Sequence, residues 1–198
     1  GHGHSRGGGR HWVGDYVRMV EDIRAAHPGV PLTSENFSEP YIGSFDGFLT
    51  WSPNYPEDIP GIPAVYSGYA ICFGSLAIEG YDLETFRQLV GRCFLWGGQC
   101  GWLEEWLLED AHREKFDYLV RLAELRAGAL EFFSDGELVG EVANRAKVAK
   151  LHQKWELWNR KVDADFPAVM ATRWRAPSGK EMVAVANYSN AEQDFDGG

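Results

Sequence analysis

Two short segments in the first quarter of the 198-residue chain each carry a carboxylate beside aromatic side chains. Leu32-Thr33-Ser34 is followed directly by Glu35, and Asp46 precedes a segment that ends in Trp51. Strands that deliver acids and aromatic rings to one face are how a (β/α) barrel assembles a site for cleaving sugars. We therefore take Glu35 as the candidate catalytic residue.

The chemistry expected of Glu35 is general acid catalysis. In a cleft lined by Phe37, Tyr41 and Trp51, the charged form of this carboxyl group would be disfavoured. Its pKa would then rise toward the value that a general acid needs. The alternative is a strand-end glutamate that caps the next helix or pairs with an arginine.

Other side chains near Glu35 are candidates for binding the substrate. Glu39 could be a partner carboxylate or bind sugar hydroxyls, although it could also be a solvated loop residue. Asp46 could contact the sugar, but an Asp-Gly pair often only makes a turn. Tyr41 and Trp51 could stack on a sugar ring or fill the core, and Tyr66 could point its hydroxyl into the pocket.

The glycine-rich opening segment carries His2 and His4, which could lie on one side of an extended chain. A zinc site needs further ligands at characteristic spacing, and none follows. We therefore expect His2 and His4 to hydrogen-bond the substrate, and we expect no metal and no other cofactor.

A second glycine-rich segment, Gly97-Gly98-Gln99-Cys100-Gly101-Trp102, follows an apolar run. It lacks the Lys-Ser/Thr pair of a phosphate-binding loop and the spacing of a dinucleotide fingerprint. It predicts a tight loop at the mouth of the barrel that presents Trp102.

Composition excludes several classes of partner. The chain has 19 Lys and Arg against 29 Asp and Glu, a formal charge of −10, which repels a nucleic-acid backbone. No apolar run approaches the ~18 residues of a membrane helix. The cysteines Cys72, Cys93 and Cys100 lack metal-finger spacing and indicate small buried side chains. A carbohydrate is the expected partner, because the eight tryptophans and eight tyrosines offer flat faces for sugar rings.

The order of elements predicts an α/β protein. Apolar spacing indicates helices over 12–23, 86–93 and 116–130, and short apolar runs indicate strands at 32–34, 45–51, 64–66 (continuing toward 71) and 94–96. Strands that alternate with helices indicate a parallel sheet. Four such strands make the C-terminal half of a (β/α)8 TIM-like barrel, which we assign to residues 1–140.

The last part of the chain is expected to be all-β. A hairpin is predicted around residues 134–136, and strands at 168–174 and 181–188 flank a turn at 176–179. An isolated hairpin is marginal in water, so residues 141–198 are expected to open a β-sandwich domain. We also expect the chain to be a fragment, whose exposed barrel edges could lead to self-association.

Three motifs together resemble a known group of proteins. They are His2-Gly3-His4 with Gly7-Gly8-Gly9 and Trp12, then Leu32-Thr33-Ser34-Glu35, then Asp46-Gly47-Phe48-Leu49. Over roughly residues 1 to 140 the chain resembles bacterial glycoside-hydrolase-like proteins with a domain of unknown function, which are distantly related to the endo-α-N-acetylgalactosaminidases.

That resemblance implies a retaining glycosidase with an Asp nucleophile after the fourth barrel strand and a Glu acid/base after the fifth. If residues 32–35 end the fifth strand, Glu35 matches the acid/base, and the nucleophile is expected just upstream of Gly1. Two alternatives stay open: a barrel that binds carbohydrate without cleaving it, and a structural fragment that needs a partner chain.

Overall fold

The computed structural model describes residues 5–6, 10–50, 55–74, 78–157 and 160–198. Its helices are α1 (Trp12–Ala26), α2 (Gly61–Tyr66), α3 (Leu83–Leu95), α4 (Arg113–Gly128) and α5 (Leu130–Phe133), with 3₁₀ turns η1 (Glu39–Tyr41), η2 (Glu105–Leu108) and η3 (Asp110–His112). Its strands are β1 (Ser5–Arg6), β2 (Arg10–His11), β3 (Thr33–Ser34), β4 (Gly47–Leu49), β5 (Ile71–Gly74), β6 (Gln99–Cys100), β7 (Glu137–Glu141), β8 (Lys150–Leu157), β9 (Arg160–Pro167), β10 (Val169–Arg175) and β11 (Glu181–Asn187).

A four-stranded parallel sheet occupies the first half of the chain. Its order is β3-β4-β5-β6, so each strand pairs with the next strand in the sequence. A barrel wall is built in this way, whereas a doubly wound sheet reverses its order partway. The sheet therefore provides consecutive strands of the kind that a barrel requires, and the half barrel itself stays a prediction.

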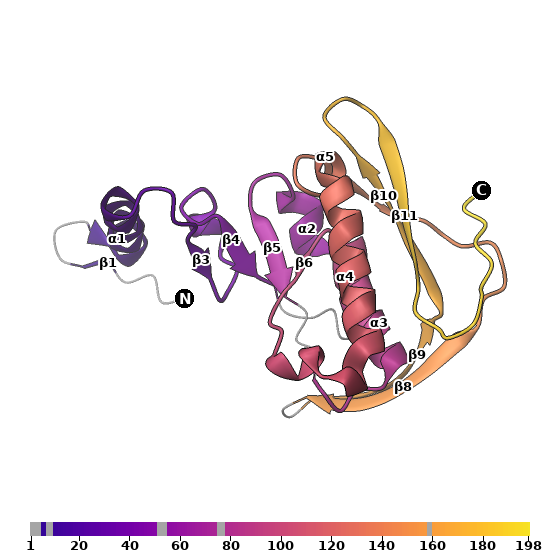
Figure 1. The fold of residues 1–198 in the computed structure, drawn as a ribbon. Coiled ribbons are helices and arrows are strands. Elements are labelled where there is room, and N and C mark those ends of the chain that lie inside the picture. The colour runs from indigo at the N-terminus through magenta and orange to yellow at the C-terminus, as the bar shows by residue number, and fades with distance from the viewer. Residues whose placement is uncertain (1–4, 7–9, 51–54, 75–77, 158–159) are drawn as a thin grey trace.

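Helix α3 is the most deeply buried of the described helices and contacts both halves of the molecule. The Asp82 carboxylate accepts a hydrogen bond from the Thr85 N–H at 2.7 Å and caps the first turn. Phe86, Leu89 and Val90 are almost inaccessible to solvent, because α3 contacts β6 and α4 as well as the strands β10 and β11. In Figure 1, α3 and α4 lie between the parallel sheet and the C-terminal strands.

The C-terminal part forms two antiparallel sheets. One has the order β11-β10-β7, and the other is the hairpin of β8 and β9. Strands at 168–174 and 181–188 were expected and are confirmed as β10 and β11, with Gly179 at φ +84° in the turn between them. Strands β8 and β9 lie in the part of the chain expected to be all-β, but their bounds were not predicted. Whether these strands open a sandwich stays a prediction.

The predicted positions of two strands of the parallel sheet are wrong. Residues 64–66 belong to α2, because Pro60 and Pro63 occupy the start and first turn of a helix, where proline is tolerated. The strand begins only at Ile71. Residues 94–96 end α3, and the strand that follows is the two-residue β6, which is too short to leave a periodic signal in the sequence.

The expected hairpin around residues 134–136 is also absent. Helix α5 precedes this turn, and β7 after it pairs with β10 rather than with a preceding strand. The expected helices at 12–23, 86–93 and 116–130 are confirmed within α1, α3 and the pair α4–α5. Within the described residues, no helix combines the length and the apolar character needed to cross a membrane.

Candidate functional site

The carboxyl ends of the parallel strands form one edge of the sheet. Glu35 comes directly after β3 and Thr50 directly after β4. The Thr50 N–H donates to the Phe73 carbonyl at 2.8 Å, and the Gly101 N–H donates to the Gly74 carbonyl at 2.8 Å, so the pairing with β5 continues one residue beyond β4 and β6. In barrel enzymes this edge carries the catalytic groups.

Glu35 itself is open to solvent. Its backbone lies in a bend, and the neighbouring Ser34 hydroxyl donates to the Asn36 carbonyl at 3.1 Å. The aromatic cleft expected around Glu35 is not formed by the described residues, because the Phe37 ring packs onto Phe48 and Tyr66 at centroid distances of 5.3 and 5.0 Å. The carboxylate is therefore accessible to a ligand, while the described residues build no wall over it.

Tyr41 lies in the core. Its side chain is 7% exposed and packs against Tyr16 and Phe45, with ring centroids 4.9 and 6.3 Å away. Burial, followed by the neighbouring Tyr16, raises the pKa of Tyr41. Because α1 covers this ring, the structure places Tyr41 beneath the surface rather than in a stacking position.

Glu39 and Tyr66 are brought together by the fold. The Tyr66 hydroxyl donates a hydrogen bond to Glu39 Oε1, and this bond raises the pKa of Tyr66. Tyr66 is the last residue of α2 rather than part of a strand, so the hydroxyl expected in a pocket is engaged with a carboxylate instead. The pair links η1 to α2.

Asp46 lies at the opposite, amino end of the sheet. One of its oxygens accepts hydrogen bonds from the Leu32 N–H at 2.7 Å and from Arg24 Nη2 at 2.9 Å. The bond from Leu32, together with Arg24, holds the pKa of Asp46 below its ordinary value. Asp46 thus ties α1 to the start of the sheet, and it does not share an edge with Glu35.

Trp102 was expected at a loop beside the site, and the structure splits that loop. Gly97 and Gly98 precede β6, whereas Trp102 follows it on the carboxyl edge. Trp102 has φ +58°, the left-handed region that side chains other than glycine rarely adopt, and it is 37% exposed. Strain of this kind concentrates at functional positions.

The separation of Trp102 from Glu35 limits what the two can do together. They follow β6 and β3, which are three strand spacings apart, or roughly 14 Å at ~4.8 Å per strand. One small ligand group therefore cannot contact both side chains at once. No pattern in the sequence predicts the positive φ of Trp102, because the conformation of the loop imposes this backbone angle.

Three of the expected binding residues, His2, His4 and Trp51, lie outside the described residues. Within the part of the chain that the structure describes, no group of three or more His, Cys, Asp or Glu side chains could hold a metal ion. The cysteines Cys72, Cys93 and Cys100 are free thiols; Cys72 and Cys93 are buried, as expected, and Cys100 is half-buried.

Comparison with known families supports part of the resemblance. Residues 1–77 match the family described as "Domain of unknown function (DUF6259)". This match supports the resemblance to proteins with a domain of unknown function, over a shorter stretch than the motifs indicated. The link to the endo-α-N-acetylgalactosaminidases and a bacterial origin stay predictions.

Two curated relatives are similar to the chain. "Putative glycoside hydrolase 22789" of Monosiga brevicollis is 35% identical over 111 residues, covering 51% of this chain and 9% of that protein. "Putative glycoside hydrolase" of Bacteroides thetaiotaomicron is 29% identical over 199 residues, covering 96% of this chain and 28% of that protein. The chain thus spans less than a third of the length of either relative. No solved structure matches it.

Proposed function

We propose that this chain contributes one wall of a glycoside hydrolase active site, with Glu35 as its acid/base residue. The observation that carries the proposal is the place of Glu35 directly after a strand of a parallel sheet whose strands follow chain order. The names of the two relatives agree with this chemistry. The substrate is a carbohydrate with a glycosidic bond.

The proposed mechanism is a double displacement with retention. Glu35 protonates the glycosidic oxygen while an aspartate from another part of the complete protein attacks the anomeric carbon. The bond to the leaving group breaks, and an ester joins the sugar to the aspartate. Glu35, now a carboxylate, then removes a proton from the water that releases the sugar.

The exposure of Glu35 adds a requirement to this mechanism. A general acid at neutral pH needs a raised pKa, and burial is the usual cause. We therefore propose that further walls of the site come from regions of the longer protein, since this chain covers only 28% of its relative from Bacteroides thetaiotaomicron. The wall would close over the carboxyl edge of β3.

The test is Glu35→Gln in the complete protein, assayed on a panel of aryl glycosides that includes α-linked sugars. We expect turnover to fall by about 10²–10⁴-fold, because general acid–base catalysis contributes about that much. An activated dinitrophenyl leaving group, or added azide, should restore part of the rate. Glu21→Gln, the same substitution at an exposed position of α1, is the matched control and should leave turnover unchanged.

Equal turnover of Glu35→Gln and the parent protein would remove Glu35 from the mechanism. The exposure of Glu35 also favours one alternative, a sheet edge that binds carbohydrate without cleaving it. In that case the parent protein would bind oligosaccharides in calorimetry and release no product from any glycoside of the panel.

A further inference from the structure

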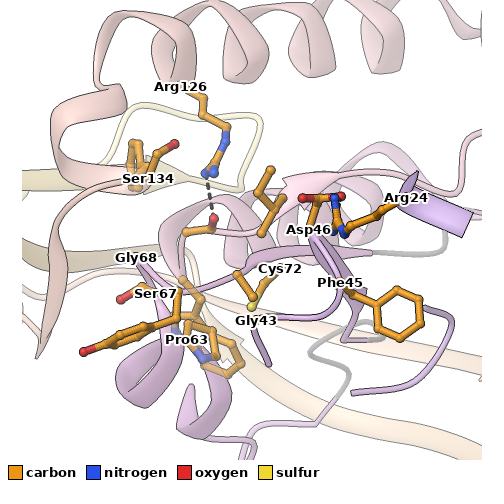
Figure 2. A pocket seen from close by; sticks show the side chains of 16 residues that line it. Arg24, Gly43, Phe45, Asp46, Pro63, Ser67, Gly68, Cys72, Arg126 and Ser134 are labelled. Atoms are coloured by element: carbon orange, nitrogen blue, oxygen red, sulfur yellow. Dashed lines mark hydrogen bonds and ion pairs between the residues drawn. The ribbon is translucent and has the colours of Figure 1, made fainter. Parts of the chain in front are cut away.

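A cavity of about 360 Å³ lies at the amino end of the parallel sheet, the end opposite to Glu35. Its walls come from the starts of β4 and β5, the segment after α2, and the carboxyl ends of α3 and α4. Figure 2 shows Arg126 reaching into it from α4, with Ser134 beside it and the pair of Arg24 and Asp46 across from it. This volume falls in the ~300–1,000 Å³ range of small-molecule sites.

Arg126 is the most unusual group in the wall of this cavity. Its residue is 9% exposed, and its Nη1 donates to the Gly97 carbonyl at 2.6 Å. Its Nε is buried without a hydrogen-bond partner among the described residues. No described carboxylate forms an ion pair with it, and the ionisable side chains that act on its charge are cysteines. A buried cation without a counter-charge is costly, so an anion in the cavity would be stabilised.

The other charges of the wall balance one another. Arg24 is paired with Asp46 at 2.9 Å and also donates to the Ser44 carbonyl at 3.0 Å. Burial raises the pKa of the Cys72 thiol to about 11, so this side chain stays neutral near pH 7. Cys100, whose pKa a hydrogen bond from Cys93 lowers, is not part of the wall. The cavity therefore presents one uncompensated positive charge.

Apolar groups surround that charge. Arg126 Cζ lies 5.5 Å from the centroid of the Phe133 ring, and Trp96 and Ile71 also line the cavity. Such a wall favours a ligand with an apolar body, and a guanidinium with unused N–H donors favours a carboxylate. A polysulfated or polyphosphorylated ligand would bring more negative charge than one arginine balances.

We propose that this cavity binds a small monocarboxylate, with the carboxylate on Arg126 and the apolar body against Phe133 and Trp96. The site is separate from the proposed sugar site, because it opens at the other end of the sheet. Its occupant would join α3, α4 and the sheet, and would therefore stabilise the folded protein in proportion to its affinity.

The experiment compares benzoate with benzamide, a neutral molecule of the same shape, by calorimetry and by thermal unfolding of the complete protein. We expect benzoate to bind and raise Tm, and benzamide to bind at least tenfold more weakly. Arg126→Gln should weaken benzoate binding at least tenfold. Arg121→Gln, on the exposed face of the same helix, is the matched control and should bind benzoate as the parent does.

Because Arg126 also holds the Gly97 carbonyl, Arg126→Gln could fail to fold, and a second variant keeps the proposal testable. Ser67→Phe adds a ring to the cavity wall from the end of α2 and leaves Arg126 in place. It should abolish benzoate binding. The proposal is overturned if the parent protein does not bind benzoate, if benzamide binds equally well, or if Ser67→Phe binds benzoate as the parent does.

Discussion

The two ends of the parallel sheet hold their charged side chains in opposite ways. At the amino end, Asp46 accepts hydrogen bonds from Arg24 and from the Leu32 backbone, and Arg126 of α4 is buried. At the carboxyl end, Glu35 is exposed and Trp102 sits in a strained loop. A side chain held by hydrogen bonds stabilises the fold, whereas an exposed side chain is free to bind a ligand or react. In this sheet the two kinds of side chain lie at opposite edges. Substitutions at the amino end should therefore lower stability, and those at the carboxyl end should mainly lower the activity proposed for that edge.

The largest stability difference is expected between Gly97→Ala and Gly101→Ala. Gly97 has φ +79°, and a Cβ there would lie 2.8 Å from Trp174 Cζ2 and closer still to Cη2. Overpacking and a left-handed conformation together should cost about 2–4 kcal/mol in the free energy of unfolding. At Gly101 the nearest contact is 3.6 Å, and the cost should stay within about 1 kcal/mol.

Urea denaturation of both variants measures this difference. Gly29→Ala is the control for the backbone alone, since Gly29 has φ +84° and no atom within 4 Å of the added Cβ. Equal stability of the Gly97 and Gly101 variants would contradict the close packing of Trp174 at the amino end.

A smaller effect is expected from Asp46→Asn, which removes the charge and keeps the shape. The side chain of Asp46 is 39% exposed, so solvent screening reduces the loss to about 1 kcal/mol at pH 7. The pKa of Asp46 is lowered in the folded protein, chiefly by the Leu32 N–H. Its contribution is therefore present above the unfolded pKa of about 3.9 and is lost as the pH falls through the folded value.

Chemical denaturation of Asp46→Asn and the parent at pH 7 and at acidic pH checks the sign. The difference in unfolding free energy should shrink as the solution is made more acidic. Glu35→Gln is the counterpart at the carboxyl edge and should change stability by less than about 0.5 kcal/mol at either pH. If Glu35→Gln destabilised the protein, the two ends of the sheet would not differ in how their side chains contribute to stability.

The smallest effect concerns the backbone of Trp102. Trp102→Gly should be more stable than Trp102→Ala by roughly 0.5 kcal/mol, because glycine adopts φ +58° without the penalty that alanine has. At the exposed helical position Ala127 the order should be reversed, with Ala127→Gly less stable than the parent. Thermal unfolding of the three variants decides whether the loop is strained.

The stronger elements of the fold could be predicted because their signals are local. Apolar residues at helical spacing identified α1, and the turn at residues 176–179 separated β10 from β11. Strand β6 could not be predicted, because its two residues owe their conformation to pairing with β5. Helix α2 was predicted as a strand, because three consecutive apolar residues are compatible with the period of a helix and with that of a strand. Only the prolines at its start distinguish the two structures.

The position of the candidate site could be predicted from the sequence, but the packing around it could not. The place of Glu35 after a strand follows from its neighbours in the sequence, and β3 confirms it. Whether Tyr41 faces a cleft or the core depends on how α1 packs, which no local pattern shows. The contact between Arg126 and the Gly97 carbonyl joins residues 29 positions apart, so the amino-end cavity was invisible in the sequence.

The carboxyl end of α3 has a consequence for how the molecule unfolds. The Leu95 carbonyl accepts hydrogen bonds from Thr172 Oγ1 at 2.8 Å and from Trp174 Nε1 at 3.1 Å, both on β10. A protease that removed β10 would leave this helix end without its donors and uncover the core around Trp174. The boundary expected near residue 140 should therefore not separate two cooperative units, and the parallel sheet and the C-terminal strands should melt in a single transition.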